Sequence, residues 1–191
     1  MRTPSCCGIV AGFTILELLV VISIILVLAG LVLATSAYVW KKGARSRTEA
    51  EIAAISAGLE SYKADNGIYP TTSATDSLKA NAEGNPSSSK YVDAGKDLYI
   101  RISGDSDGNP TTADTAKNYM ASLKPNMLSP APPGPNTYIK DPFGNCYGYS
   151  TVKALAPTGS DGYNPTFDLW STSGTSTPNN PPDQSEWIKN W

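Results

Sequence analysis

The chain has 191 residues, enough for one domain or for one small domain with an appendage. It contains no histidine, which excludes Ser-His-Asp and Cys-His catalysis as well as metal sites with histidine ligands. Its formal net charge of -2 gives it no basic footprint for binding nucleic acid. Two of its three cysteines lie in a short N-terminal segment, and the third is Cys146.

The longest apolar stretch lies near the N-terminus. Residues 18–34 read LLVVISIILVLAGLVLA without a charge, and the apolar run extends from Phe13 to Trp40. As a helix this run is about 42 Å long at ~1.5 Å per residue, more than the ~30 Å hydrocarbon core of a bilayer requires. The aromatic residues and cations from Tyr38 to Lys42 are typical of a retained span, and we therefore expect a membrane helix here.

The charges that flank this segment are unequal. Arg2 precedes it, whereas four cations follow it: Lys41, Lys42, Arg45 and Arg47. The positive-inside rule alone would place the C-terminal body in the cytoplasm. This is evidence against the orientation that the motifs below imply.

One acidic residue, Glu17, lies near the start of the apolar segment. A charged side chain at the bilayer centre costs up to ~2.5–3.5 kcal/mol, and less near the interface, so a glutamate that snorkels to the surface is one interpretation. A second comes from the preceding residues. Cleavage after Gly12 would give Phe13 a free amine on the same side of the helix tip as Glu17. In a bundle of such helices, one subunit's amine can neutralise a neighbour's carboxylate and set the axial register.

The N-terminus, MRTPSCCGIVAG followed by FTILELLVVISIILVLAGLVL, resembles the class III leader and first helix of type IV pilins and type II secretion pseudopilins. In that family a prepilin peptidase cuts after the glycine and N-methylates the new N-terminus. The resemblance implies that Gly12 is the cleavage position, Phe13 the methylated residue and Glu17 the assembly carboxylate. The sequence departs from the family in two places. Its leader has only Arg2 where relatives carry several cations, and Ala34 stands where most have a helix-kinking proline.

A helical pattern continues beyond the membrane segment. Apolar residues recur at spacings of three, four and three, which places them in one stripe facing a core: Ile52, Ile55, Leu59 and Tyr62. Asn66-Gly67 is a helix stop signal. We therefore expect one helix from about Phe13 to about Asp65. Two helices broken near Gly43 are the alternative.

The middle of the chain is rich in small polar residues, glycine and proline over residues 71–136. Weak patterns predict a short strand over 98–102 and a short helix over 118–123. The proline run over 130–135 predicts a stiff extended connector. Relatives in the pilin family are shorter here, so the resemblance implies a variable insertion at 71–136.

Three C-terminal blocks indicate a sheet. Asp-Pro-Phe-Gly-Asn over 141–145 is a turn by composition, and the alternating aromatic residues that follow it predict a strand. Residues 167–171 read as the next strand and 186–191 as a closing element. Together with the helix exit YKADNGIYPTT over 62–72, these blocks resemble the major pseudopilin of type II secretion systems.

The resemblance implies an α+β, type IV pilin-like fold, with a long N-terminal helix packed on a small C-terminal antiparallel sheet with long loops. The implied organisation has four parts: a cleaved leader at 1–12, a transmembrane and filament-core helix at 13–40, its amphipathic continuation at 41–66, and a loop-rich globular domain at 67–191.

Two segments are candidates for calcium. Asp105 to Asn109 offers oxygen ligands at alternate positions, but Pro110 and Ala116 stand where an EF-hand needs glycine and glutamate, so a solvated turn is the better interpretation. In pseudopilins, calcium binds the loop before the terminal Asn-Trp. The corresponding loop here, 172–185, keeps Asp183 but lacks the other usual aspartate, so a metal site at Asp183 rests on one carboxylate.

The function implied by the resemblance is structural rather than enzymatic: a major pseudopilin that polymerises into a helical homopolymer. The implied partners are prepilin peptidase, a secretion ATPase, a platform membrane protein and minor pseudopilins. The implied location is the inner membrane, single-pass, with a cytoplasmic N-terminus and an extracytoplasmic globular domain.

Two alternatives remain open at the level of sequence. One is the major pilin of a type IV pilus, for adhesion, motility or DNA uptake. Such pilins commonly carry a C-terminal disulfide loop, which Cys146 cannot form alone. The other is a single-span anchored enzyme or cell-surface binding module. No acidic pair lies in a recognisable catalytic motif, so the binding module is the stronger of the two.

Overall fold

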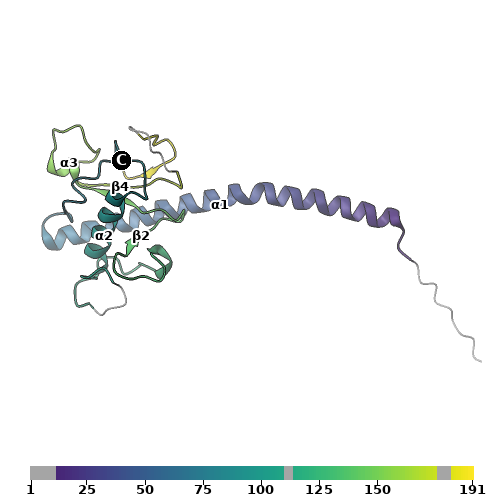
Figure 1. Cartoon of the computed structure of the whole chain (residues 1–191), viewed down its shortest axis with the longest axis horizontal. Coiled ribbons are helices and arrows are strands. Elements are labelled where there is room, and N and C mark those ends of the chain that lie inside the picture. The colour runs from purple at the N-terminus through teal and green to yellow at the C-terminus, as the bar shows by residue number, and fades with distance from the viewer. Residues whose placement is uncertain (1–11, 110–113, 176–181) are drawn as a thin grey trace, which may run out of the picture. The chain divides into compact units, whose positions relative to one another are not determined.

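A computed structural model describes residues 12–109, 114–175 and 182–191. The chain divides into two compact units, Met1–Lys42 and Gly43–Trp191. The predicted leader lies outside the described residues except for Gly12. Helix α1, Ile15–Asn66, has 52 residues and is drawn as one unbroken ribbon in Figure 1. The prediction of a single helix is therefore confirmed, and α1 continues through Gly43.

The second unit adds short elements to the last part of α1. Its helices are α2 (Ser89–Ser103), the 3-10 turn η1 (Pro125–Met127) and α3 (Val152–Leu155). Its strands are β1 (Leu128–Ser129), β2 (Tyr138–Ile139), β3 (Gly148–Ser150), β4 (Asp168–Ser171) and β5 (Ile188–Lys189). β1 pairs with β2, and β3-β4-β5 form a second sheet, all antiparallel. The predicted α+β, pilin-like fold is confirmed.

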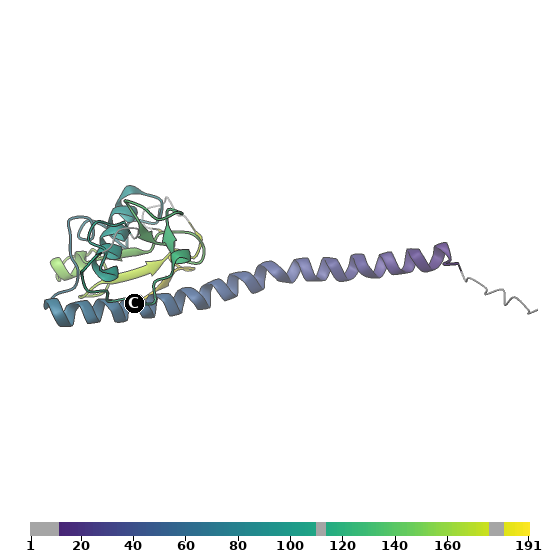
Figure 2. The ribbon, with the colours of Figure 1, turned by 90° about the horizontal axis from the view of Figure 1, so that it is seen from below.

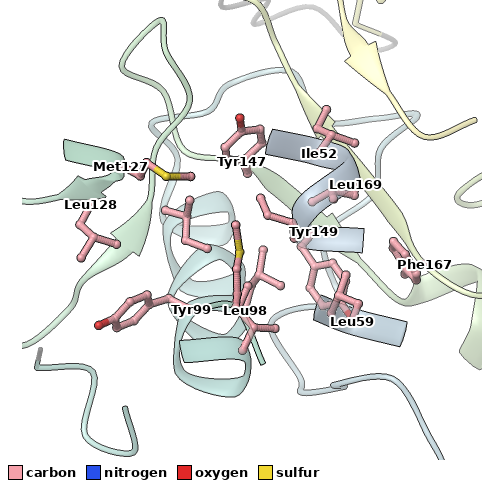
Figure 3. Packing of buried hydrophobic residues seen from close by; sticks show 14 of the residues in the cluster. Ile52, Leu59, Leu98, Tyr99, Met127, Leu128, Tyr147, Tyr149, Phe167 and Leu169 are labelled. Atoms are coloured by element: carbon pink, nitrogen blue, oxygen red, sulfur yellow. The ribbon is translucent and has the colours of Figure 1, made fainter. Parts of the chain in front are cut away.

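The main core of the second unit lies between α1, α2 and the sheet. Figure 2 shows α2 and the sheet on one side of the last part of α1. Ile55 and Leu59 of α1 are fully buried, as the sequence stripe predicts. Figure 3 shows side chains from all three elements meeting: Ile52, Leu59, Leu98, Tyr99, Tyr149 and Leu169.

Strand β4 is buried on both faces. Successive strand residues point to opposite faces, so Leu169 joins the main core while Trp170 joins a second cluster. In that cluster the ring of Trp170 stacks on Trp187 with centroids 6.0 Å apart, and it meets Trp191 edge-on at 5.8 Å. The C-terminal residues are therefore held by aromatic contacts to the central strand of the sheet.

The strand predicted over 98–102 is wrong, because these residues end helix α2. The alternation of Leu98, Ile100 and Ile102 suggested a strand. The residues that α2 buries instead follow helical spacing over a longer window: Tyr91, Ala94, Gly95, Leu98, Tyr99 and Ile102. The helical spacing is visible over the whole of α2 but not within the short segment 98–102.

The helix predicted over 118–123 is also wrong. The backbone N–H groups of Tyr119 and Met120 donate to the carbonyl of Ile102, at 2.9 and 3.1 Å. These bonds satisfy a carbonyl at the end of α2, where the helix leaves it without an internal partner. The segment therefore closes α2 and does not form its own helix.

The proline-rich segment 130–135 is not an extended connector. It lies in the loop that joins the antiparallel strands β1 and β2. The peptide bonds before Pro130 and Pro132 are cis, whereas the predicted polyproline conformation is all trans. The chain reverses direction between β1 and β2, because these two strands pair antiparallel.

Helix α2 packs against Cys146 at Gly95 without space for a side chain. A Cβ at Gly95 would overlap Sγ of Cys146 and lie 3.6 Å from Cβ of Tyr138. Alanine normally stabilises a helix interior relative to glycine, but overpacking costs about 1–3 kcal/mol. We predict that Gly95→Ala lowers the free energy of unfolding by that amount, measured by urea denaturation of the full chain in detergent micelles.

The matched test removes the sulfur. In a Cys146→Ala background the added methyl group has space, so Gly95→Ala should cost clearly less there than in the natural chain. An equal loss of unfolding free energy in both backgrounds would contradict the close packing of α2 at this point.

Candidate functional site

The predicted processing and assembly residues lie together at the start of α1. Gly12 and Phe13 precede the helix, and the Phe13 side chain is 82% exposed. Thr14 is the residue before the first helical position, and Glu17 lies in the first turn. Their roles in cleavage, methylation and assembly stay predictions, but the structure places them within one helical turn.

Glu17 and Thr14 form a reciprocal capping box. Oε2 of Glu17 accepts hydrogen bonds from the backbone N–H and the hydroxyl of Thr14, both at 2.9 Å. In return, Oγ1 of Thr14 accepts from the backbone N–H of Glu17 at 3.2 Å. This arrangement satisfies N–H groups that a helix start leaves without partners. Among the described residues, both hydrogen bonds to this carboxylate end on Oε2 rather than on Oε1.

Thr14 is the site residue that the sequence interpretation missed. The signal was present, because Thr-x-x-Glu directly before an apolar run is the sequence form of a capping box. The prediction for Glu17 rested on its charge and did not include its role as a helix cap. The same carboxylate therefore fixes the helix start before any neighbour is present.

The apolar part of α1 has no cover among the described residues. In the part of the chain that the structure describes, α1 is the helix long and apolar enough to cross a membrane, and its most apolar stretch is 0% buried. Its polar side chains are satisfied within the helix: the hydroxyl of Ser23 donates to Val20 O at 2.7 Å, and that of Thr35 to Leu31 O at 3.1 Å. Lipid or other apolar helices must therefore cover this surface.

Curated relatives match the chain over the parts that carry these features. The chain is 37% identical over 102 residues to the type II secretion system core protein G of Aeromonas hydrophila, which covers 52% of this chain and 69% of that protein. The chain belongs to the core protein G family of type II secretion systems.

Other members of the core protein G family match over shorter segments. The chain is 36% identical over 91 residues to the Klebsiella pneumoniae protein, covering 47% of this chain and 63% of that one. It is 44% identical over 61 residues to the Escherichia coli (strain K12) protein, covering 32% and 42%. These two matches span less than two thirds of the relative. No family model and no solved structure matches the chain.

Membership of the core protein G family supports a pseudopilin role in secretion, which is structural rather than enzymatic. Together with the apolar helix, it fits anchoring in the inner membrane and multi-subunit partners of a pseudopilus.

The calcium expectation at Asp183 stays a prediction. Asp183 is exposed, and its Oδ1 accepts the backbone N–H of Ser185 at 2.9 Å, which lowers the pKa of the carboxyl group. Among the described residues, Asp183 does not belong to a group of three potential metal ligands. Part of the loop, 176–181, lies outside them.

Three carboxylates meet at the other calcium candidate. Ligand oxygens of Asp105, Asp107 and Asp114 lie within 4.8 Å of one another. Asp105 is buried rather than solvated, and it accepts the hydroxyl of Tyr99 at 2.7 Å and the backbone N–H of Asn109 at 2.9 Å. The protein itself thus supplies hydrogen-bond donors to Asp105. Among the described residues, no other observation indicates a bound ion. Residues 110–113 lie outside the described part.

The Asp-Pro-Phe-Gly-Asn turn is built around a buried carboxylate. Oδ1 of Asp141 accepts the backbone N–H groups of Phe143 and Asn145, at 3.0 and 2.8 Å, and Oδ2 accepts the hydroxyl of Ser171 in β4 at 2.5 Å. Burial raises the pKa of Asp141, and the nearby Glu51 adds to the rise, against the lowering effect of the three donors. The predicted turn is therefore tied directly to the central strand.

This raised pKa predicts how stability changes with pH. A carboxyl group with a higher pKa in the folded than in the unfolded protein destabilises the folded state when both are ionised, and the penalty disappears as pH falls through the folded pKa. Asn at this position can keep both backbone bonds and donate to Ser171. We predict that Asp141→Asn gains stability relative to the natural chain as pH rises from about 4 to 7.

The measurement is urea denaturation of both proteins at several pH values in that window. Titrating groups that do not interact with Asp141, such as Asp168, are common to both chains and cancel in the difference. A difference in unfolding free energy that is independent of pH, or that shrinks as pH rises, would contradict the buried position of Asp141.

Proposed function

We propose that this chain is the major pseudopilin of a type II secretion-like system, a subunit that polymerises through its N-terminal helix to help protein export. The observation that carries the proposal is an apolar helix surface that no described residue covers, with one carboxylate, Glu17, in its first turn. Membership of the core protein G family supports the same role.

The proposed assembly begins in the membrane. Prepilin peptidase cuts after Gly12 and methylates the new amine of Phe13. A secretion ATPase and a platform membrane protein then move subunits from the bilayer into a helical filament, which minor pseudopilins join. In the filament the 13–40 helices of neighbouring copies replace lipid as the cover for each apolar surface.

Glu17 gives the filament its register. In the single subunit its Oε2 accepts two hydrogen bonds from Thr14, and the residue is exposed, so a further donor can reach the carboxylate. After processing, the α-amine of Phe13 in a neighbouring copy is a cation that can pair with the Glu17 carboxylate at a similar depth in the bundle. An unpaired charge in an apolar core is costly, so only the axial offset that pairs the two groups is stable.

The proposed orientation places the globular unit outside the cytoplasm. The processing motif at residues 12–17 supports it, because the family resemblance that the motif carries implies a cytoplasmic N-terminus. The cations that follow the span oppose it under the positive-inside rule. We give the motif more weight, since it involves three specific residue types at fixed spacing, Gly12, Phe13 and Glu17.

The type IV pilus subunit is the second candidate, and two observations favour the pseudopilin over it. The curated relatives carry the name of the secretion system. Cys146 is a buried free thiol, and burial raises its pKa, so it does not serve a C-terminal disulfide loop with any described residue.

Replacement of Glu17 tests the proposal. We predict that Glu17→Gln leaves membrane insertion intact but reduces filaments by at least about tenfold, because loss of one partner from a buried ion pair costs ~3–5 kcal/mol. The measurement is electron microscopy of cells that overproduce the chain, with membrane fractionation to confirm insertion.

Glu49→Gln is the matched control. Glu49 is an exposed glutamate of the same helix that lies outside the apolar segment, so its loss should leave filament number unchanged. Normal filaments from Glu17→Gln would overturn the register mechanism. Loss of filaments from both variants would show a general effect of charge rather than a specific pair.

A further inference from the structure

A small polar pocket lies where α1 meets the Asp141 turn in the second unit. It has a volume of about 280 Å³. Two of its lining residues are cations from distant parts of the sequence, Arg47 and Lys140, and a third is the exposed amide Asn126. The fold therefore brings together two positive groups that the sequence separates.

The carboxylates near this pocket face inward and already have donors. Glu51 is 9% exposed and accepts Nε of Arg47 and the hydroxyl of Tyr147, both at 2.8 Å. Asp141 is 3% exposed and accepts three donors of its own. Asp141 lines the pocket as well. Because both carboxylates are buried, the two cations are the more accessible charges at the pocket surface.

Arg47 and Lys140 have donor groups left for a ligand. Arg47 donates to Glu51 through Nε, and its two terminal nitrogens donate no hydrogen bond to a described residue. The ammonium of Lys140 makes no ion pair within 4.0 Å with the described carboxylates. A guanidinium with free terminal N–H groups suits the paired oxygens of a phosphate group.

The pocket cannot lie far from the membrane surface. Tyr38 and Trp40 are exposed aromatic residues at the end of the apolar segment, a position typical of the headgroup layer. Arg47 follows Trp40 by seven residues, which span ~10 Å as helix and at most ~25 Å when fully extended. Because chain length sets this limit, it holds for any arrangement of the two units.

We propose that this pocket binds the phosphate of an anionic phospholipid headgroup in the leaflet next to the second unit. The contact would hold the globular unit close to the bilayer while the subunit awaits assembly. The proposal rests on membrane anchoring and does not require cleavage after Gly12 or filament formation. It assigns a role to Lys140, which the packing of the core does not use.

Lipid titration of the full chain in detergent micelles tests the proposal, with native mass spectrometry to measure the affinity for a short-chain phosphatidylglycerol. Basic residues near a membrane surface contribute about fivefold each to the binding of anionic lipid. We expect Lys140→Gln to weaken binding about fivefold and Arg47→Gln/Lys140→Gln about thirtyfold. Phosphatidylcholine should bind more weakly than phosphatidylglycerol, and inorganic phosphate should compete only at far higher concentration.

Arg101→Gln/Lys117→Gln is the matched control, because it removes the same two charge types at another pocket of this unit. Binding should change less than twofold in that variant. Lys140→Gln alone is decisive if the double variant unfolds, since Lys140 does not support the buried Glu51.

Several results would overturn the proposal. Equal affinity for the two lipids, or equal losses in pocket and control variants, would remove the specific site. Inorganic phosphate that binds as tightly as the lipid would assign the pocket to a soluble anion. If the pocket variants bind lipid as well as the natural chain but lose self-association in analytical ultracentrifugation, the pocket binds a carboxylate of a second copy instead.

Discussion

A carboxylate in the first turn of an otherwise apolar helix is the constraint on which the account depends. Glu17 lies at the start of a helix surface that the described part of the chain does not bury. In the single chain its charge is held by Thr14, which uses the helix start as a source of donors. That arrangement is stable at a membrane interface, where water reaches the remaining oxygen. It is incomplete in the dry core of a bundle, where a second positive group is needed.

The second unit uses buried polar groups for a different purpose. Tyr147 donates to Glu51 of α1, and Asp141 joins its turn to Ser171 in β4. Each bond links segments far apart in sequence, so the loops are positioned by specific contacts although the strands are only two to four residues long. Arg45 adds a similar link, since its guanidinium donates to the carbonyl of Glu186 at 2.7 Å.

The sequence predicted the parts of the fold that local patterns determine. The helix stripe at Ile55 and Leu59, the Asp141 turn and the strand at Leu169 all have strong local signals, and the structure contains each of them. Family resemblance supplied the fold class and the roles proposed for Phe13 and Glu17. Those roles depend on neighbouring subunits, which a single chain does not contain.

The parts that failed depend on contacts made at a distance. Residues 98–102 alternate like a strand, yet the helical period that begins at Tyr91 decides their conformation. Residues 118–123 have helix-forming composition, but the end of α2 binds their backbone. The pocket of Arg47 and Lys140 could not be predicted, because only the folded chain brings α1 to the turn.

The central claim is that the mature helix begins with the charged amine of Phe13, which is available to the Glu17 carboxylate of the adjoining copy. The most direct measurement is the intact mass of the protein purified from its native membrane or filament. The account predicts a chain that starts at Phe13 and carries one added methyl group. A chain that retains Met1 and the following eleven residues would have no such amine, and it would contradict the account.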